Sequence, residues 1–243
     1  MIILHGFLGC LDNWQSVAKS LSDQYQVFVP DLPNHGRSPH SNQFNFKILA
    51  EEISAFIRSH MDVPINAIGH SMGGKILLEI VNSQPEIFQK MVIADIGTKS
   101  YPPEQSAMMV DLLQMPISQF KSRSEAVDYL TNLGYNASFV LFLMKNLDRS
   151  DQQEFKWKAN IPVLTENYFE ILKSVEPSKP IHIPILFVRG SESHYITSGD
   201  QVQLEVQYQK ALFHTIDHAG HWVHADQPDE FVRTVRDFFN SHN

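Results

Sequence analysis

The stretch that decides the fold is Ile65-Asn-Ala-Ile-Gly-His-Ser-Met-Gly-Gly-Lys75. Its first part, residues 65–68, is an apolar run that predicts a buried strand, and residues 75–81 have the spacing of a helix. Between them Ser71 is flanked by Gly69 and Gly73, and small residues at these positions permit a sharp turn from strand to helix. We expect a strained backbone that exposes Ser71 at the end of the strand, rather than a merely structural glycine-serine turn.

Strand-like and helix-like segments alternate on both sides of this turn. Buried strands are predicted at residues 2–4, 27–29, 65–68, 91–94, 185–188 and 212–216. Helices with apolar residues at three- and four-residue spacing are predicted at residues 14–21, 46–60, 75–81, 202–208 and 231–239. This order predicts an α/β fold with a mostly parallel central sheet flanked by helices.

The alternation stops between about Tyr101 and Pro180. This stretch opens with Pro102-Pro103, has helical patterns at residues 124–133 and 139–147, and closes on a proline breaker at residues 177–180. We interpret residues 101–180 as a helical cap inserted into a core domain of residues 1–100 and 181–243. The alternative is a helical domain unrelated to the site, but insertions after sheet strands commonly lie over the ligand crevice.

The composition indicates a globular protein that does not bind nucleic acid. Of the 243 residues, 43% are hydrophobic, and a single domain of this length buries roughly 70–75% of its unfolded surface. The chain has 19 Lys and Arg against 27 Asp and Glu, which gives a formal charge of −8. Such a chain lacks the basic surface that a phosphate backbone requires.

Neither a membrane segment nor an export signal is expected from the sequence. No apolar stretch approaches the roughly 20 residues of a membrane helix, so we expect no membrane insertion. The N-terminal Met-Ile-Ile-Leu-His-Gly lacks the basic start and cleavage site of a signal peptide. The single cysteine, Cys10, has no partner for an internal disulfide, as is usual in a reducing compartment. We therefore expect a cytoplasmic protein.

A serine hydroxyl is a poor nucleophile until a neighbouring base removes its proton. Of the twelve histidines, His221 lies in the loop between the last predicted strand and the last predicted helix, where side chains reach the same sheet edge as Ser71. His218 and His224 are nearby rivals. Together with His214, these histidines are also dense enough to suggest a metal site. We expect no metal, because Gly220 interrupts any helix that would align them and no His-Glu-x-x-His motif is present.

The base needs a carboxylate that fixes its tautomer and stabilises the imidazolium. Asp95 directly follows the predicted strand at residues 91–94, and Glu192 follows the predicted strand at residues 185–188. Both positions lie at the sheet edge that carries Ser71. Asp200 is a weaker third candidate because it begins a predicted helix. From the residues alone, Asp95 and Glu192 both remain candidates.

Backbone N–H groups are expected to hold the oxyanion that develops during attack on a carbonyl. The residue after the serine, Met72, supplies one, and Phe7 in the loop after the first strand supplies the other. His5 is interpreted as a brace of that loop. Cys10 lies close by, but without a better-placed base we interpret its thiol as inert.

Five stretches resemble the α/β-hydrolase-fold serine hydrolases. They are LHGFLG from Leu4, DLPNHGRS from Asp31, GHSMGGK from Gly69, VIADIG from Val92 and HAGHWVHADQPDEF from His218. More narrowly, the chain is similar to the bacterial YbfF-type esterases. That similarity rests on Leu11-Asp-Asn-Trp14, Asn34-His-Gly-Arg-Ser38, Lys75 and Gly220-His-Trp-Val-His-Ala225.

The narrower resemblance bears on the choice of acid. Most α/β-hydrolases have their acid in a Gly-x-x-Asp turn, where this chain reads Gly190-Ser-Glu-Ser193. YbfF-type enzymes use the aspartate after the preceding strand instead, which corresponds to Asp95. The resemblance therefore favours Asp95 over Glu192.

The resemblance implies a serine esterase with no cofactor. Ser71, His221 and Asp95 would form the triad, and an acyl-enzyme on Ser71 would be hydrolysed by water. The substrate would be a small-molecule carboxylic ester or thioester, and the aromatic residues of the cap favour an apolar acyl group. Carbon–carbon bond hydrolysis, perhydrolysis or ligand binding without catalysis are the alternatives on the same fold.

The chain departs from the family at its start. Family members normally have two further strands before the His-Gly loop, whereas this chain starts within the strand that leads into it. We therefore expect an uncovered sheet edge at this strand.

Overall fold

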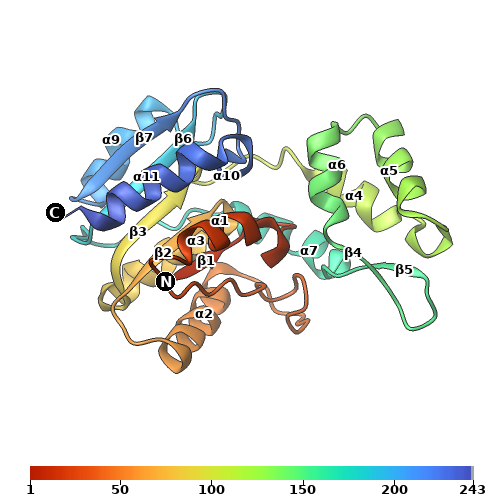
Figure 1. The fold of residues 1–243 in the computed structure, drawn as a ribbon, viewed down its shortest axis with the longest axis horizontal. Helices are drawn as coiled ribbons and strands as arrows, with labels where there is room; N and C mark the ends of the chain where they lie inside the picture. Colours follow the sequence, from red (N-terminus) through yellow and green to blue (C-terminus); the bar gives the residue numbers. More distant parts are fainter. Residues whose placement is uncertain (242–243) are drawn as a thin grey trace.

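A parallel sheet forms the middle layer of the core, beside the lobe of residues 101–180 (Figure 1). The computed structural model describes residues 1–241, and within them this sheet has five strands. In spatial order they are β1 (Ile2–Leu4), β2 (Ile65–His70), β3 (Phe88–Ala94), β6 (Ile185–Gly190) and β7 (Ala211–Ile216). Every neighbouring pair is parallel, so the carboxyl ends of all the strands meet at one edge of the sheet. The predicted parallel sheet is confirmed.

The prediction of a strand at residues 27–29 is wrong, because the structure has no strand there. Only Phe28 pairs there, in a single parallel bridge with Ile2. The Ile3 N–H donates to the Phe28 carbonyl at 2.9 Å, and the Phe28 N–H donates to the Met1 carbonyl at 3.0 Å. Pro30 follows directly, and because proline has no N–H it cannot extend the ladder. The segment nevertheless lies along the outer edge of β1, the edge expected to be uncovered.

Helices cover both faces of the sheet (Figure 1). One apolar cluster joins alternate strand residues, among them Ile3 and Val92, to α1 (Gln15–Leu21) and α11 (Pro228–Asn240). A second cluster lies on the opposite face. It packs the sheet against α2 (Phe46–His60), α3 (Met72–Ser83) and α9 (Ser198–Gln207). Side chains of a strand alternate between faces, which is why each strand feeds both clusters.

Local sequence accounts for the helix bounds. In α2 the side chain of Asn45 accepts a hydrogen bond from the Ile48 N–H at 3.0 Å and so caps the first turn. Leu49, Ile53 and Ile57 recur every fourth residue and are buried. The remaining short elements of the core are the 3-10 turns at Leu11–Asn13 and Pro85–Ile87 and the helix α10 (Val223–Asp226).

Residues 101–180 fold as a mainly helical lobe beside the sheet (Figure 1). Its elements are α4 (Ser106–Gln114), a 3-10 turn at Ile117–Gln119, α5 (Arg123–Asn132), α6 (Ala137–Met144), β4 (Leu147–Arg149), β5 (Phe155–Trp157), α7 (Ile161–Glu166) and α8 (Tyr168–Leu172). The lobe is mainly helical, but it also contains an antiparallel hairpin of β4 and β5, which the sequence did not predict. The helix predicted at residues 139–147 ends at Met144, and Leu147 begins β4.

The two ends of this lobe leave and rejoin the core at one place. The Tyr101 N–H donates to the Leu172 carbonyl at 2.9 Å, and the Val175 N–H donates to the Thr98 carbonyl at 2.8 Å. Both connections lie just beyond the carboxyl end of β3. The lobe is therefore attached at the sheet edge that carries Ser71.

Across residues 1–241 there is no helix with the length and apolar character needed to cross a bilayer.

The packing of α11 predicts the effect of a core substitution. Phe231 has 0% of its surface exposed and meets the Trp14 ring edge-on, with centroids 5.9 Å apart. We expect Phe231→Ala to lower the free energy of unfolding by about 3–5 kcal/mol, because the truncation leaves a cavity between the helix and the sheet. Urea denaturation measures the change. Val206→Ala is the control, since Val206 is 69% exposed and its truncation should change stability by less than about 0.5 kcal/mol.

Candidate active site

Ser71 occupies a strained turn between β2 and α3. Its φ of 51° and ψ of −119° lie in a region that non-glycine residues rarely adopt. The Ser71 N–H donates to the Ala94 carbonyl at 3.1 Å, which ties the turn to the end of β3. The strained turn expected from the sequence is present.

The flanking glycines are required by close backbone contacts. A Cβ on Gly73 would lie 2.5 Å from the Leu4 carbonyl oxygen, and one on Gly69 would lie 2.7 Å from the Gly73 carbonyl oxygen. Neither distance is compatible with a side chain. Gly73 therefore lets α3 start directly against the end of β1, and Gly69 lets the first turn of α3 lie against β2.

His221 and Asp95 are hydrogen-bonded to each other. The His221 Nδ1 lies 2.8 Å from Asp95 Oδ2. Asp95, directly after β3, is 0% exposed, whereas His221 lies in the loop between β7 and α10. An Nδ1–H that donates to the carboxylate leaves the Nε2 of the neutral ring free to accept a proton.

Two further groups hold the Asp95 carboxylate. The Gly190 N–H donates to Oδ1 at 3.2 Å, and the Ser193 hydroxyl donates to Oδ2. A buried carboxylate is costly unless it is hydrogen-bonded, and these donors satisfy that need. They also fix the direction in which the carboxylate faces His221.

Aromatic rings hold the His221 loop. The Tyr195 ring stacks on the His221 ring with centroids 3.9 Å apart. The His70 Nε2 lies 2.8 Å from the His221 carbonyl oxygen. Burial and the neighbouring histidines keep the pKa of His70 well below its usual range, so its neutral ring donates this hydrogen bond.

Ser71 and His221 line one cavity of about 210 Å³. Its wall also contains Phe7 and Met72, the residues expected to supply the backbone N–H donors. The lobe of residues 101–180 contributes aromatic and aliphatic side chains, namely Tyr101, Met108, Phe139, Phe142, Tyr168, Ile171 and Leu172. The cavity thus lies between the sheet edge and the lobe.

Two buried histidines brace the loop that contains Phe7. The His5 Nε2 accepts the Leu32 N–H at 2.9 Å, and the His35 Nε2 accepts the Leu8 N–H at 3.2 Å. Burial lowers the pKa of His5 to about 4 and that of His35 to about 3, so both rings are neutral acceptors at pH 7. These contacts agree with the interpretation of His5 as a brace.

The other candidate acids point elsewhere. Glu192 has an exposed side chain, and its backbone N–H donates to the Ala219 carbonyl at 2.9 Å. Asp200 pairs with Lys99, with Oδ2 2.6 Å from Nζ, and caps the first turn of α9. Within residues 1–241, Asp95 is the carboxylate hydrogen-bonded to His221.

The rival histidines have separate surroundings. His218 is exposed, His214 lies 3.5 Å from Glu230, and His224 stacks on Trp14 with centroids 4.0 Å apart. Burial lowers the pKa of His224 to about 3. The part of the chain that the structure describes contains no group of three or more His, Cys, Asp or Glu side chains arranged to hold a metal.

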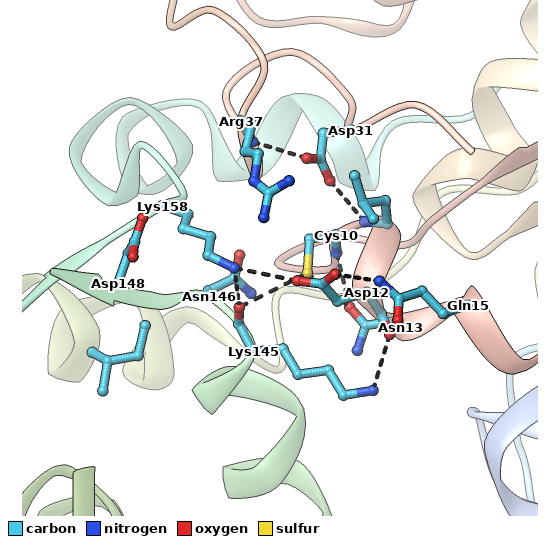
Figure 2. A network of polar contacts seen from close by, with 12 residues as sticks. Cys10, Asp12, Asn13, Gln15, Asp31, Arg37, Lys145, Asn146, Asp148 and Lys158 are labelled. Atoms are coloured by element: carbon cyan, nitrogen blue, oxygen red, sulfur yellow. Dashed lines mark hydrogen bonds and ion pairs between the residues drawn. The ribbon is translucent and has the colours of Figure 1, made fainter. Parts of the chain in front are cut away.

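Cys10 belongs to a polar network between the core and the lobe (Figure 2). Its thiol is 3.5 Å from Asn13 Oδ1 and 4.0 Å from the Lys145 carbonyl oxygen. In the same network, Asp12 Oδ2 is 3.3 Å from the Lys158 Nζ (Figure 2). Burial raises the pKa of the Cys10 thiol, which keeps it protonated and unreactive.

Sequence reasoning did not find Ser193 or Tyr195. Ser193 lies in the Gly190 turn, where the family pattern has a carboxylate, and its hydroxyl instead holds the acid that follows β3. Tyr195 follows two residues later, and no local pattern marks it as the ring that stacks on His221. Both contacts join residues that are distant in the sequence.

Comparisons with known proteins identify the relatives of this chain. Residues 1–228 match the sequence model of the alpha/beta hydrolase fold. A Haemophilus influenzae protein named as an esterase/lipase is 31% identical over 242 residues, covering 99% of this chain and 83% of that protein. Esterase YbfF of Escherichia coli is 27% identical over 241 residues, covering 99% of this chain and 92% of YbfF. The resemblance inferred from the motifs is confirmed.

The solved structure of an esterase from a marine microorganism has the same fold. It matches with a TM-score of 0.94 at 35% identity and covers 98% of this chain and 94% of that chain.

The contacts of Asp95 predict the reactivity of Ser71. We expect a fluorophosphonate to label Ser71 in the wild type and to label Asp95→Asn about a thousandfold more slowly, because the amide no longer fixes the His221 tautomer. Mass spectrometry of the intact chain over time measures the rate. Glu192→Gln is the matched control and should be labelled at the wild-type rate. Slow labelling of Glu192→Gln together with normal labelling of Asp95→Asn would reverse the assignment of the acid.

Proposed function

This chain belongs to the α/β-hydrolase fold family, and on that premise we propose that it is a serine hydrolase of carboxylic esters or thioesters. The observation that carries the proposal is the 2.8 Å hydrogen bond between His221 and Asp95, beside the cavity that His221 shares with Ser71. An orienting acid, a base and a strained serine are the parts that nucleophilic acyl transfer requires. The names of the relatives, esterase/lipase and esterase, support the same class.

In the first half of the reaction, the Ser71 oxygen attacks the acyl carbonyl carbon while His221 Nε2 takes the hydroxyl proton. The Asp95 carboxylate stabilises the imidazolium that forms. The N–H groups of Phe7 and Met72 hold the negative oxygen of the tetrahedral intermediate. The intermediate collapses when the bond to the leaving group breaks and His221 returns the proton to that group. The acyl group is then bonded to Ser71.

In the second half, water replaces Ser71 as the nucleophile. His221 takes a proton from the water, the water oxygen bonds to the acyl carbon, and the bond to the Ser71 oxygen breaks. His221 then gives the proton to Ser71. Every step uses side chains and amides of this chain.

We also propose that residues 101–180 act as a cap over the site. Their aromatic and aliphatic side chains form much of the cavity wall, while Ser71 and His221 come from the core. Such a wall suits an acyl group with an apolar chain.

The proposal predicts turnover of activated esters. We expect the wild type to hydrolyse p-nitrophenyl esters of two- to eight-carbon acids, and Ser71→Ala to lose at least about 10³-fold in kcat because the covalent intermediate no longer forms. Release of p-nitrophenol measures turnover, and mass spectrometry of quenched enzyme detects the acyl group on Ser71. Ser59→Ala is the control, since Ser59 is exposed on α2 and lies outside the cavity wall.

Two results would contradict the esterase proposal. If the wild type hydrolyses no ester or thioester, although Ser71 reacts with fluorophosphonate, a ligand-binding protein is the better reading. If Ser71→Ala keeps wild-type turnover, the reaction does not pass through Ser71.

A further inference from the structure

A second ionisable side chain of α3 lies at the cavity. Lys75, one helical turn after Ser71, lines the cavity although the residue is only 1% exposed. Its Nζ donates one hydrogen bond, to the Lys173 carbonyl at 2.5 Å. Within residues 1–241 no carboxylate forms an ion pair with it. An ammonium has three N–H groups, so two of them have no hydrogen-bond acceptor among the described residues.

The other buried lysine shows how such a group is normally satisfied. Lys90 is 6% exposed, lies in β3 and is not part of the cavity wall. Its Nζ donates to the Phe238 carbonyl at 2.9 Å, the Ser241 carbonyl at 2.5 Å and the Ser241 hydroxyl at 2.9 Å. All three N–H groups of Lys90 therefore have acceptors. Lys75 differs from Lys90 because it lies at the cavity and two of its N–H groups have no hydrogen-bond acceptor among the described residues.

Two aromatic rings lie beside the Lys75 ammonium and attract it by cation–π interaction, but within residues 1–241 they add no hydrogen-bond acceptor. Its Nζ lies 4.8 Å from the centroid of the Tyr101 ring and 5.5 Å from that of the Phe46 ring. Burial lowers the pKa of Lys75 to about 7, because the charged form loses its hydration. A negative group at the cavity would restore the charged form and accept the spare N–H groups.

Of the two lysines in the cavity wall, Lys75 is the one without an acidic partner within residues 1–241. Lys99 also lines the cavity, but Asp200 neutralises it with Oδ2 2.6 Å from Nζ. The remaining ones are His221, which pairs with Asp95, and the side chains of His70, Glu104, His194, Tyr101, Tyr168 and Tyr195.

We propose that Lys75 determines substrate specificity by binding a carboxylate on the acyl part of the substrate, so that half-esters of short dicarboxylic acids are preferred. This inference rests on the proposed ester hydrolysis at Ser71. Lys75 contacts the end of the acyl group that is farthest from the ester bond.

The position of Lys75 relative to Ser71 sets the length of that acyl group. One turn of helix rises about 5.4 Å, and helical side chains tilt toward the N-terminal end, here toward Ser71. An acyl group bonded to Ser71 therefore needs only a short chain to bring its terminal carboxylate to Lys75. A neutral acyl group of the same length leaves the two N–H groups unsatisfied, which is the situation in which polar sites discriminate most strongly.

Two ethyl esters of equal chain length test the inference. Ethyl hydrogen glutarate carries a terminal carboxylate, whereas ethyl valerate ends in a methyl group. Release of ethanol gives kcat/KM for each ester with the wild type, Lys75→Met and the control Lys90→Met. We expect the wild type to favour the half-ester, and Lys75→Met to lower the ratio of the two kcat/KM values at least tenfold. Lys90→Met should leave the ratio unchanged.

Each contrary result has its own meaning. An equal loss for both esters in Lys75→Met would show that Lys75 only ties α3 to Lys173, and the inference would fail. A wild type that hydrolyses ethyl valerate but does not favour the half-ester would also overturn it, while the esterase proposal would stand. If the wild type hydrolysed neither ethyl ester and none of the p-nitrophenyl esters, both the esterase proposal and the inference about Lys75 would be overturned.

A second measurement does not depend on the folding of Lys75→Met. With the wild type, the ratio of kcat/KM for the half-ester to that for ethyl valerate should fall as the pH rises through about 7, because the Lys75 ammonium is then lost. The carboxylate of the half-ester stays ionised over this range. An effect of pH on catalysis that is common to both esters cancels in the ratio. A ratio that does not change between pH 6 and pH 9 would overturn the inference.

Discussion

The close contact between α3 and the end of β1 is the constraint on which the candidate site depends. Gly73 lies against the carbonyl oxygens of Leu4 and His5, where a Cβ would be 2.5 and 2.6 Å away. This contact places the Ser71 turn beside the loop that contains Phe7. Because the sheet is parallel, Asp95 and His221 reach the same edge from β3 and β7. The three groups meet there although they are far apart in the chain.

The histidines around the site show how their surroundings determine their roles. His5, His35, His70 and His224 are buried, and burial lowers the pKa of each. The neutral rings of the first three pair with backbone N–H or carbonyl groups and brace the loops of the site. His221 differs because its ring meets a carboxylate. A carboxylate partner suits a ring that must carry a proton during catalysis.

The lobe of residues 101–180 is joined to the core at three places. At its ends, a backbone hydrogen bond links Val175 to Thr98 of the core. On its side, the network of Figure 2 links Asp12 to Lys158. Lys75 adds a third link, because it lies on the helix that begins at the Ser71 turn and donates to the Lys173 carbonyl. The cavity wall and the Ser71 turn are thereby held in one arrangement.

The sequence by itself determined the elements and the serine turn, whereas the tertiary structure decided the partners. Residues 46–60 and the Gly69 to Gly73 turn were predictable because periodicity, capping and glycine spacing act over a few residues. The hairpin of β4 and β5 and the single bridge at Phe28 were not, because pairing depends on a neighbouring strand. The choice of Asp95 over Glu192 rests on a contact that spans 126 residues, and the spare N–H groups of Lys75 depend on what packs around them. Such contacts exist only once the chain has folded.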